Sequence, residues 1–147
     1  MQNYTKGKLG VVRLDEKAIE EAKKILEKIE EKFDVQFAVL AEMGNGTGED
    51  YREKFLLIVS EDFAKMKPEE RIAKIKSVTQ LETGIDLYPH TLLEFKNLLK
   101  RYQGYVFEAI EHGIVLKDNG IFKKVRDAVK NNLRIVKIDP ETIWELY

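Results

Sequence analysis

The segment at residues 55–60 (FLLIVS) constrains the fold of this chain more than any other stretch. Every side chain before Ser60 is large and apolar, so the segment has no polar face to turn toward water. A β-strand of this composition has to be covered on both faces, as the central strand of a buried sheet is. We therefore expect a sheet with this strand in its interior.

Further strands are predicted on either side of this segment. Residues 35–40 (VQFAVL) are rich in β-branched and aromatic side chains and predict one neighbour. Residues 85–88 (IDLY) predict another, which Pro89 should close. Shorter extended pieces are expected at residues 8–14, 114–116 and 133–138.

Helical patterns separate these strands. Apolar side chains recur at intervals of three and four residues, which is the pattern of an amphipathic helix. The combination predicts the α/β (α+β) class: a small mixed sheet covered largely on one side by helices. A chain of 147 residues without a linker or repeat suits one domain, residues 1–147. The helices are expected to begin at Asp15, Pro68 and Thr91 and to occupy residues 106–113 and 121–131.

The composition excludes several classes of protein. No cysteine is present, which excludes disulfides, thiolate catalysis and cysteine-ligated zinc. Only His90 and His112 could supply imidazole, and each is expected to have a surface or helix-capping role. The formal net charge of −1 argues against nucleic acid as a partner. Tyr102, Tyr105 and Phe107 could stack on bases, but their helical spacing indicates packing within the protein.

The same composition suggests where the protein works. No stretch has the length or hydrophobicity of a signal peptide or membrane span, so we expect a cytoplasmic protein without membrane contact. Charged residues make up 35% of the chain, mostly Lys and Glu. This enrichment is typical of hyperthermophiles and suggests a thermophilic, archaeal source.

The glycine-rich loop Gly44-Asn45-Gly46-Thr47-Gly48 permits two interpretations. Glycines let backbone amides approach an anion, so the loop could bind a phosphate group. However, neither the GxxxxGK[ST] pattern nor a following helix is present, and Asn-Gly is a strong signal for a tight turn. Taken alone, the loop is better explained as a plain connection between two strands.

Acidic residues are the other candidates for chemistry. Two metal ligands on one strand must be two residues apart to share a face, and the residue two after Glu53 is Phe55. Asp86 lies in an apolar strand, where a carboxylate needs a polar partner or an ion. The full set of candidate carboxylates is Glu49, Asp50, Glu53, Glu61, Asp62 and Asp86.

Three phrases of the sequence occur in the order and spacing of a known family. They are FAVLAEMGNGTGEDYREKFLLIVSEDF at residues 37–63, GIDLYPHTLLEFKNLLKR at residues 84–101 and VFEAIEHGIVLKDNG at residues 106–120. With these phrases the chain resembles the minimal nucleotidyltransferases of the DNA polymerase β-like superfamily over residues 35–131. The resemblance implies a nucleotidyltransferase-like fold and, in an active member, Mg²⁺-dependent transfer of a nucleoside monophosphate.

The resemblance also implies which residues would form the site. The family's Gly-Ser motif falls on Glu42-Met43 or, with a shift, on Gly44-Asn45, so Gly44, Asn45, Gly46 and Thr47 are the expected nucleotide-binding residues.

The family's three metal-binding aspartates fall on Glu53, Phe55 and Asp86. Glu53 and Asp86 are therefore the expected metal ligands, whereas Phe55 removes the one between them, and we expect a degenerate active site without catalytic residues.

Three functions remain open at this stage. A degenerate nucleotidyltransferase-fold protein would act by binding a nucleotide or a partner, and the resemblance implies a small helical protein of the HEPN type, as in toxin–antitoxin pairs. An active enzyme would use Mg²⁺ to transfer a nucleoside monophosphate to a protein, RNA or small molecule. A structural module would form homo-oligomers through apolar surface near Trp144 and Tyr147.

Overall fold

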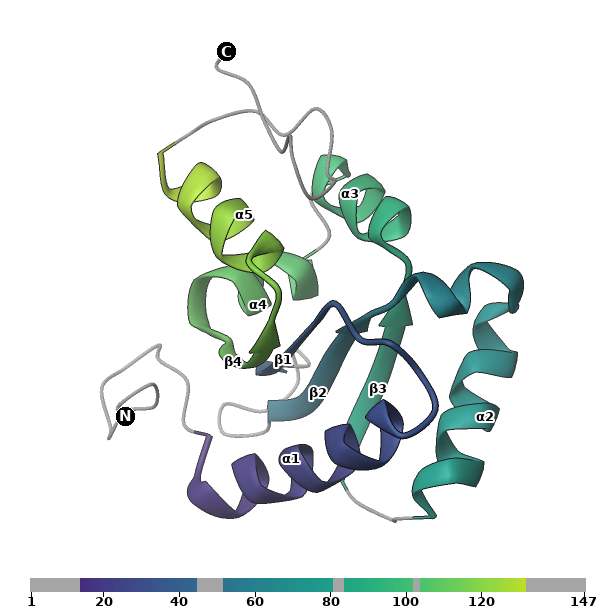
Figure 1. Cartoon of the computed structure of the whole chain (residues 1–147). Helices are drawn as coiled ribbons and strands as arrows, with labels where there is room; N and C mark the ends of the chain where they lie inside the picture. The colour runs from purple at the N-terminus through teal and green to yellow at the C-terminus, as the bar shows by residue number, and fades with distance from the viewer. Residues whose placement is uncertain (1–13, 45–51, 81–83, 102–103, 132–147) are drawn as a thin grey trace.

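The computed structural model describes residues 14–44, 52–80, 84–101 and 104–131, which form a four-stranded sheet between two layers of helices (Figure 1). The strands are β1 (Phe37–Gly44), β2 (Arg52–Val59), β3 (Ile85–His90) and β4 (Ile114–Asp118). The helices are α1 (Glu16–Glu30), the 3-10 turn η1 (Glu61–Lys65), α2 (Pro68–Thr79), α3 (Leu92–Lys100), α4 (Gly104–His112) and α5 (Ile121–Lys130).

The sheet is mixed, with strand order β3-β2-β1-β4. Strand β1 is antiparallel to both β2 and β4, whereas β2 and β3 run parallel. The segment at residues 55–60 lies largely in β2, an interior strand, as its composition predicts. The expected fold class, a small mixed sheet packed with helices, is confirmed.

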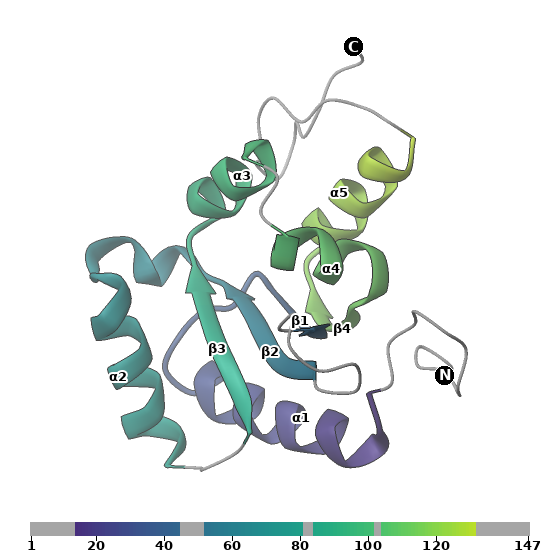
Figure 2. The same ribbon diagram turned by 180° about the vertical axis from the view of Figure 1, so that it is seen from behind.

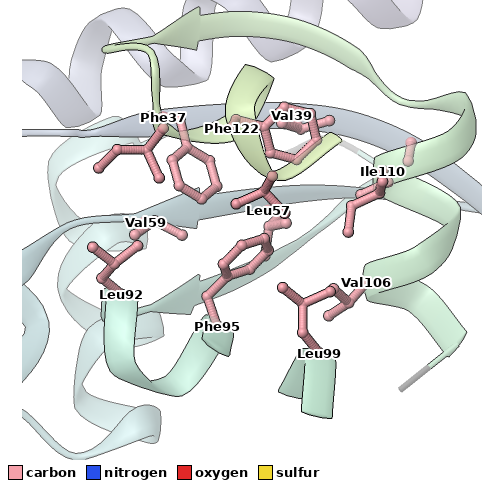
Figure 3. Packing of buried hydrophobic residues seen from close by; sticks show 14 of the residues in the cluster. Phe37, Val39, Leu57, Val59, Leu92, Phe95, Leu99, Val106, Ile110 and Phe122 are labelled. Carbon is pink, nitrogen blue, oxygen red and sulfur yellow. The ribbon is translucent and has the colours of Figure 1, made fainter. Parts of the chain in front are cut away.

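Helices cover both faces of the sheet, so the expectation of cover largely on one side is wrong. Phe55, Leu57 and Val59 of β2 pack with helices α3, α4 and α5 (Figure 3), while Leu56 and Ile58 face α1 and α2. Both views of the ribbon place these two groups of helices on opposite sides of the sheet (Figures 1 and 2). The physical reason is the lack of a polar face on β2, which leaves neither side fit for water.

Helix starts follow the local signals in the sequence. The Asp15 carboxylate accepts a hydrogen bond of 2.9 Å from the Ala18 amide and caps α1. Pro68 is the first residue of α2, and Thr91 caps α3 in a box with Glu94. Described residues include no helix with the length and hydrophobicity needed to span a membrane.

Strand ends differ from the sequence prediction. β1 continues through Gly44, which pairs with Arg52, so Gly44 is a strand residue and not part of a loop. β3 does not stop at Pro89 but runs on to His90. Proline is tolerated because β3 is an edge strand and needs hydrogen-bond donors on one side only. Predictions for Asn45, Gly46 and Thr47, and for residues 8–13, 133–138, Trp144 and Tyr147, fall outside the described residues.

Candidate functional site

The three positions implied by the family resemblance lie together on one face of the sheet. Phe55 of β2 is directly opposite Asp86 of the parallel strand β3. Glu53 precedes Phe55 by two residues and therefore shares its face, which is the face covered by α3, α4 and α5. The structure thus brings Glu53 and Asp86 to the same face of neighbouring strands, with Phe55 next to both.

Phe55 is packed in an aromatic cluster. Its side chain is only 2% exposed, and its ring stacks on Tyr88 with centroids 5.0 Å apart and an interplanar angle of 18°. The edge of a third ring, Tyr105, approaches Phe55 at 5.8 Å and Tyr88 at 4.7 Å. Offset and edge-to-face contacts of this kind stabilise a core beyond simple burial. Phe55 therefore fills its position with hydrocarbon and offers no atom that could bind a metal.

Glu53 and Asp86 border this cluster and are both exposed. The expectation that Asp86 needs a polar partner or an ion inside an apolar strand is wrong, because β3 lies at the sheet edge and this side chain reaches water. Both carboxylates are close enough to Tyr88 to act on its hydroxyl. Burial raises the pKa of Tyr88, and the negative charges of Asp86 and Glu53 raise it further.

The described residues do not assemble a two-metal centre. Glu53 and Asp86 provide two carboxylates on this face, and described side chains include no group of three or more His, Asp or Glu residues able to hold a metal ion. Such a centre uses carboxylates that converge on ions shared between them, and Phe55 interrupts that set.

Other candidate carboxylates have structural partners. Glu61 accepts a hydrogen bond of 2.8 Å from the Leu92 amide at the start of α3. Asp62 accepts one of 2.7 Å from the Asp34 amide. Both therefore bind backbone amides, and Glu61 satisfies one of those left unpaired at the start of α3. Glu49 and Asp50 fall outside the described residues.

An ion pair between a buried arginine and a partly exposed glutamate lies at the other end of β3. Arg71 of α2 is 3% exposed, and its two terminal nitrogens donate to the Glu94 carboxylate of α3 at 2.6 and 2.9 Å. The same guanidinium donates to the carbonyl oxygens of Pro89 and Met66 at 3.1 and 3.0 Å. Arg71 therefore covers the free edge of β3 and ties α2 to α3 around it.

His90 extends this network. Its Nε2 lies 2.9 Å from the Tyr105 hydroxyl, and its Nδ1 lies 3.7 Å from a Glu94 oxygen. Burial lowers the pKa of His90, although the nearby Glu94 partly opposes the shift. Burial also raises the pKa of Tyr105 to about 12. A neutral imidazole with its proton on Nδ1, which faces Glu94, and with Nε2 accepting a hydrogen bond from the Tyr105 hydroxyl fits both directions of pKa shift.

The surface or capping role expected for His90 is therefore wrong. The extension of β3 beyond Pro89 places this side chain against Tyr105 on the covered face of the sheet. His112, in contrast, lies in the last turn of α4 as expected and is 38% exposed.

Sequence reasoning missed this network, although signals for it exist. Tyr88 and His90 are two residues apart and so share a strand face. Arg71 and Ile75 are four residues apart in α2, so a charge sits in line with a core position of that helix. Glu94 is three residues after Thr91, where a capping box expects an acid. The signal for the Arg71–Glu94 pairing itself is absent, because it depends on a contact between distant segments.

Comparison with known proteins gives one structural match. No protein-family model matches the sequence, and no curated protein does. A crystal structure from Sulfolobus solfataricus, provisionally described as a nucleotidyltransferase, is similar to this chain. Its TM-score is 0.42, its sequence identity is 16%, and the alignment covers 76% of this chain and 94% of the other.

Proposed function

We propose that this protein has a nucleotidyltransferase-like fold but acts by binding a partner protein or a nucleotide, without transferring nucleotides. The observation that carries this proposal is Phe55. It is 2% exposed and stacked on Tyr88, at the sheet position where the resemblance implies the central metal ligand.

The packing of Phe55 makes it costly to restore a metal ligand at this position. For a metal-binding atom to take the place of Phe55, the ring would have to leave its contacts with Tyr88 and Tyr105. Removing a buried phenylalanine from a core typically destabilises a protein by about 3–5 kcal/mol. One carboxylate fewer also leaves more charge on the ions uncompensated, which weakens their binding.

An active Mg²⁺-dependent enzyme is the second candidate, and one observation favours it. Glu53 and Asp86 remain on the same face of neighbouring strands, and the charges of both act on the Tyr88 hydroxyl. In this alternative Mg²⁺ would be held by these two carboxylates and would neutralise charge on the triphosphate. The chain's own contribution would then be limited to orienting that ion.

A transfer assay separates the two candidates. The full-length protein is incubated with ATP labelled at the α-phosphate, Mg²⁺ and a mixture of protein and RNA acceptors, and the label on each acceptor is counted. We expect no more label than with the Glu53→Gln, Asp86→Asn double variant. Glu69→Gln, an exposed carboxylate on α2, serves as the matched control. Transfer by the wild type that persists in Glu69→Gln and disappears in the double variant would establish the enzyme instead.

Two partner proteins are candidates. One is a small helical protein of the HEPN type, which the family resemblance implies, and the other is a second copy of this chain. Leu93 of α3, 62% exposed, is the one large apolar side chain in the described part that is strongly exposed. Light scattering over a hundredfold range of concentration tests self-association, and a monomer throughout would leave a different partner or a nucleotide as the ligand.

A further inference from the structure

A cavity of about 350 Å³ lies between α2, β3 and α3, beside the Arg71–Glu94 pair. From β3 it is lined by residues 87–90, and Asp86 is not among its lining residues. Its volume is within the range of small-molecule sites, about 300–1,000 Å³, and near the lower limit. The cavity is therefore suited to a compact ligand.

Most of the wall is apolar or aromatic. Ile72 of α2, Leu87 of β3 and Leu98 of α3 provide aliphatic surface, and Tyr88 and Tyr105 provide two rings set edge to face at 4.7 Å. Aromatic side chains offer large, flat contact surfaces, and their preferred partners are other rings in offset or edge-to-face contact. A planar aromatic group is the ligand that this wall would best accommodate.

Four polar side chains of the wall are paired with one another. Arg71 is bidentate to Glu94, and His90 is hydrogen-bonded to Tyr105. A ligand therefore has no buried charge to neutralise deep in the cavity, and these side chains are held in fixed positions.

The lining of the cavity carries an excess positive charge. Arg71 and Glu94 cancel each other, and burial keeps His90 neutral by lowering its pKa. Arg101 remains as an exposed cation of the lining, and no described residue forms a salt bridge with it. The first turn of α2 and the last turn of α3 both border the cavity, and their opposite partial charges of about half a unit offset each other. Among the lining residues, Arg101 is therefore the one charged side chain without an ionic partner in the described part of the chain.

We propose that this cavity binds a compact aromatic molecule with a single negative charge. The ring packs between the tyrosines and the aliphatic wall, and the anionic group pairs with the exposed Arg101. Neither Glu53 nor Asp86 lines this cavity, which shares only Tyr88 with their surroundings, so the site requires neither nucleotide binding nor a metal ion.

The test compares a charged probe with its uncharged match. The full-length protein is titrated with 2-naphthoate and with 2-naphthamide, and binding is followed by calorimetry and by amide chemical shifts. We expect saturable binding of both, with shifts around α3 and β3, and about tenfold higher affinity for the acid because it gains a charge-assisted contact.

Variants locate the site and the charge. Arg101→Gln should remove the preference for the acid and leave the affinity for the amide unchanged. Lys100→Gln, at the adjacent exposed cation outside the cavity lining, should keep the wild-type preference. Leu98→Trp should narrow the cavity and weaken both probes, and its thermal unfolding would show that the fold survives. The proposal is overturned if neither probe saturates, if Arg101→Gln keeps the preference, or if Lys100→Gln loses it as well.

Discussion

The two ends of strand β3 differ in whether their charged side chains are exposed or buried. Near its amino end, Asp86 reaches water beside a buried phenylalanine, Phe55. Near its carboxyl end, the edge of the strand is covered by Arg71, an arginine that is itself buried. The end where the family resemblance implies chemistry has a hydrocarbon core and solvated acids. The end for which no catalytic or binding site was predicted has the organised polar network.

This difference shows what each set of residues does for the fold. Exposed carboxylates such as Glu53 and Asp86 stay hydrated and contribute little to packing. Buried polar groups need partners, and Arg71, Glu94, His90 and Tyr105 supply one another with them. Removing a member of the second group should therefore affect folding, whereas changing the first should matter only if a ligand binds there.

The largest effect is expected from truncating Phe55. Phe55→Ala removes a side chain that is 2% exposed and its contacts with two tyrosine rings, and it should lower the free energy of unfolding by about 3–5 kcal/mol. Phe55→Leu keeps most of the volume and should lower it by about 1–2 kcal/mol. Urea denaturation measures both. A loss below about 1 kcal/mol for Phe55→Ala would mean that the ring is not a core element.

The next largest loss of stability is expected from breaking the ion pair near the carboxyl end of β3. Glu94→Gln keeps the capping oxygen but leaves the buried Arg71 charge without its partner, and we expect a loss of about 1–3 kcal/mol in unfolding free energy. The Glu94 side chain is 39% exposed, so the loss should stay below that for a fully buried pair. Arg71→Met and the double variant complete a mutant cycle. Additive effects in that cycle would contradict direct coupling between the two side chains.

Acid should destabilise the same end of the strand through His90. Burial lowers the pKa of His90 from its ordinary value of 6.5, so the unfolded chain binds this proton more readily. Stability should therefore fall as the pH drops from 6.5 toward the folded-state pKa. Thermal unfolding at pH 7.5 and pH 5.5 measures the difference, and His90→Gln should reduce it. If His112→Gln reduces the difference in thermal stability equally, His90 is not the source of that difference.

The smallest effect is expected at the exposed carboxylates. Glu53→Gln and Asp86→Asn change groups in contact with water, and each should alter the unfolding free energy by no more than about 0.5 kcal/mol. Urea denaturation at pH 7 provides the measurement. A loss as large as that of Glu94→Gln would show that these acids are held in a structural network.

Much of the fold could be predicted from the sequence because its signals are local. The two-sided apolar composition of residues 55–60, the Asp15 and Thr91 caps and the start of α2 at Pro68 all correspond to elements in the structure. The order of elements suggested helices largely on one face. The apolar composition of β2 on both of its faces requires helices on both, as the structure has them. The end of β3 was predicted too early because a proline ends a strand only where a backbone N–H donor is required. At Pro89, in an edge strand of the described sheet, no such donor is required.

The candidate site could be predicted only in part. The resemblance placed Glu53, Phe55 and Asp86 on neighbouring strands, and the parallel register of β2 and β3 puts them on one face. The stacking of Phe55 on Tyr88 and the pairing of Arg71 with Glu94 join residues 33 and 23 positions apart, respectively, in the sequence. Such contacts depend on the packing of helices around the sheet, for which a single sequence carries no local signal.

A crystal soaked with ATP and Mg²⁺ tests the central claim most directly. The distances to read are those from any bound ion to the carboxylates of Glu53 and Asp86, together with the ring positions of Phe55 and Tyr88. Our account predicts that the two rings stay stacked and that no ion joins the two carboxylates to the triphosphate. An Mg²⁺ ion bound by both carboxylates and by the triphosphate, with Phe55 displaced, would contradict it.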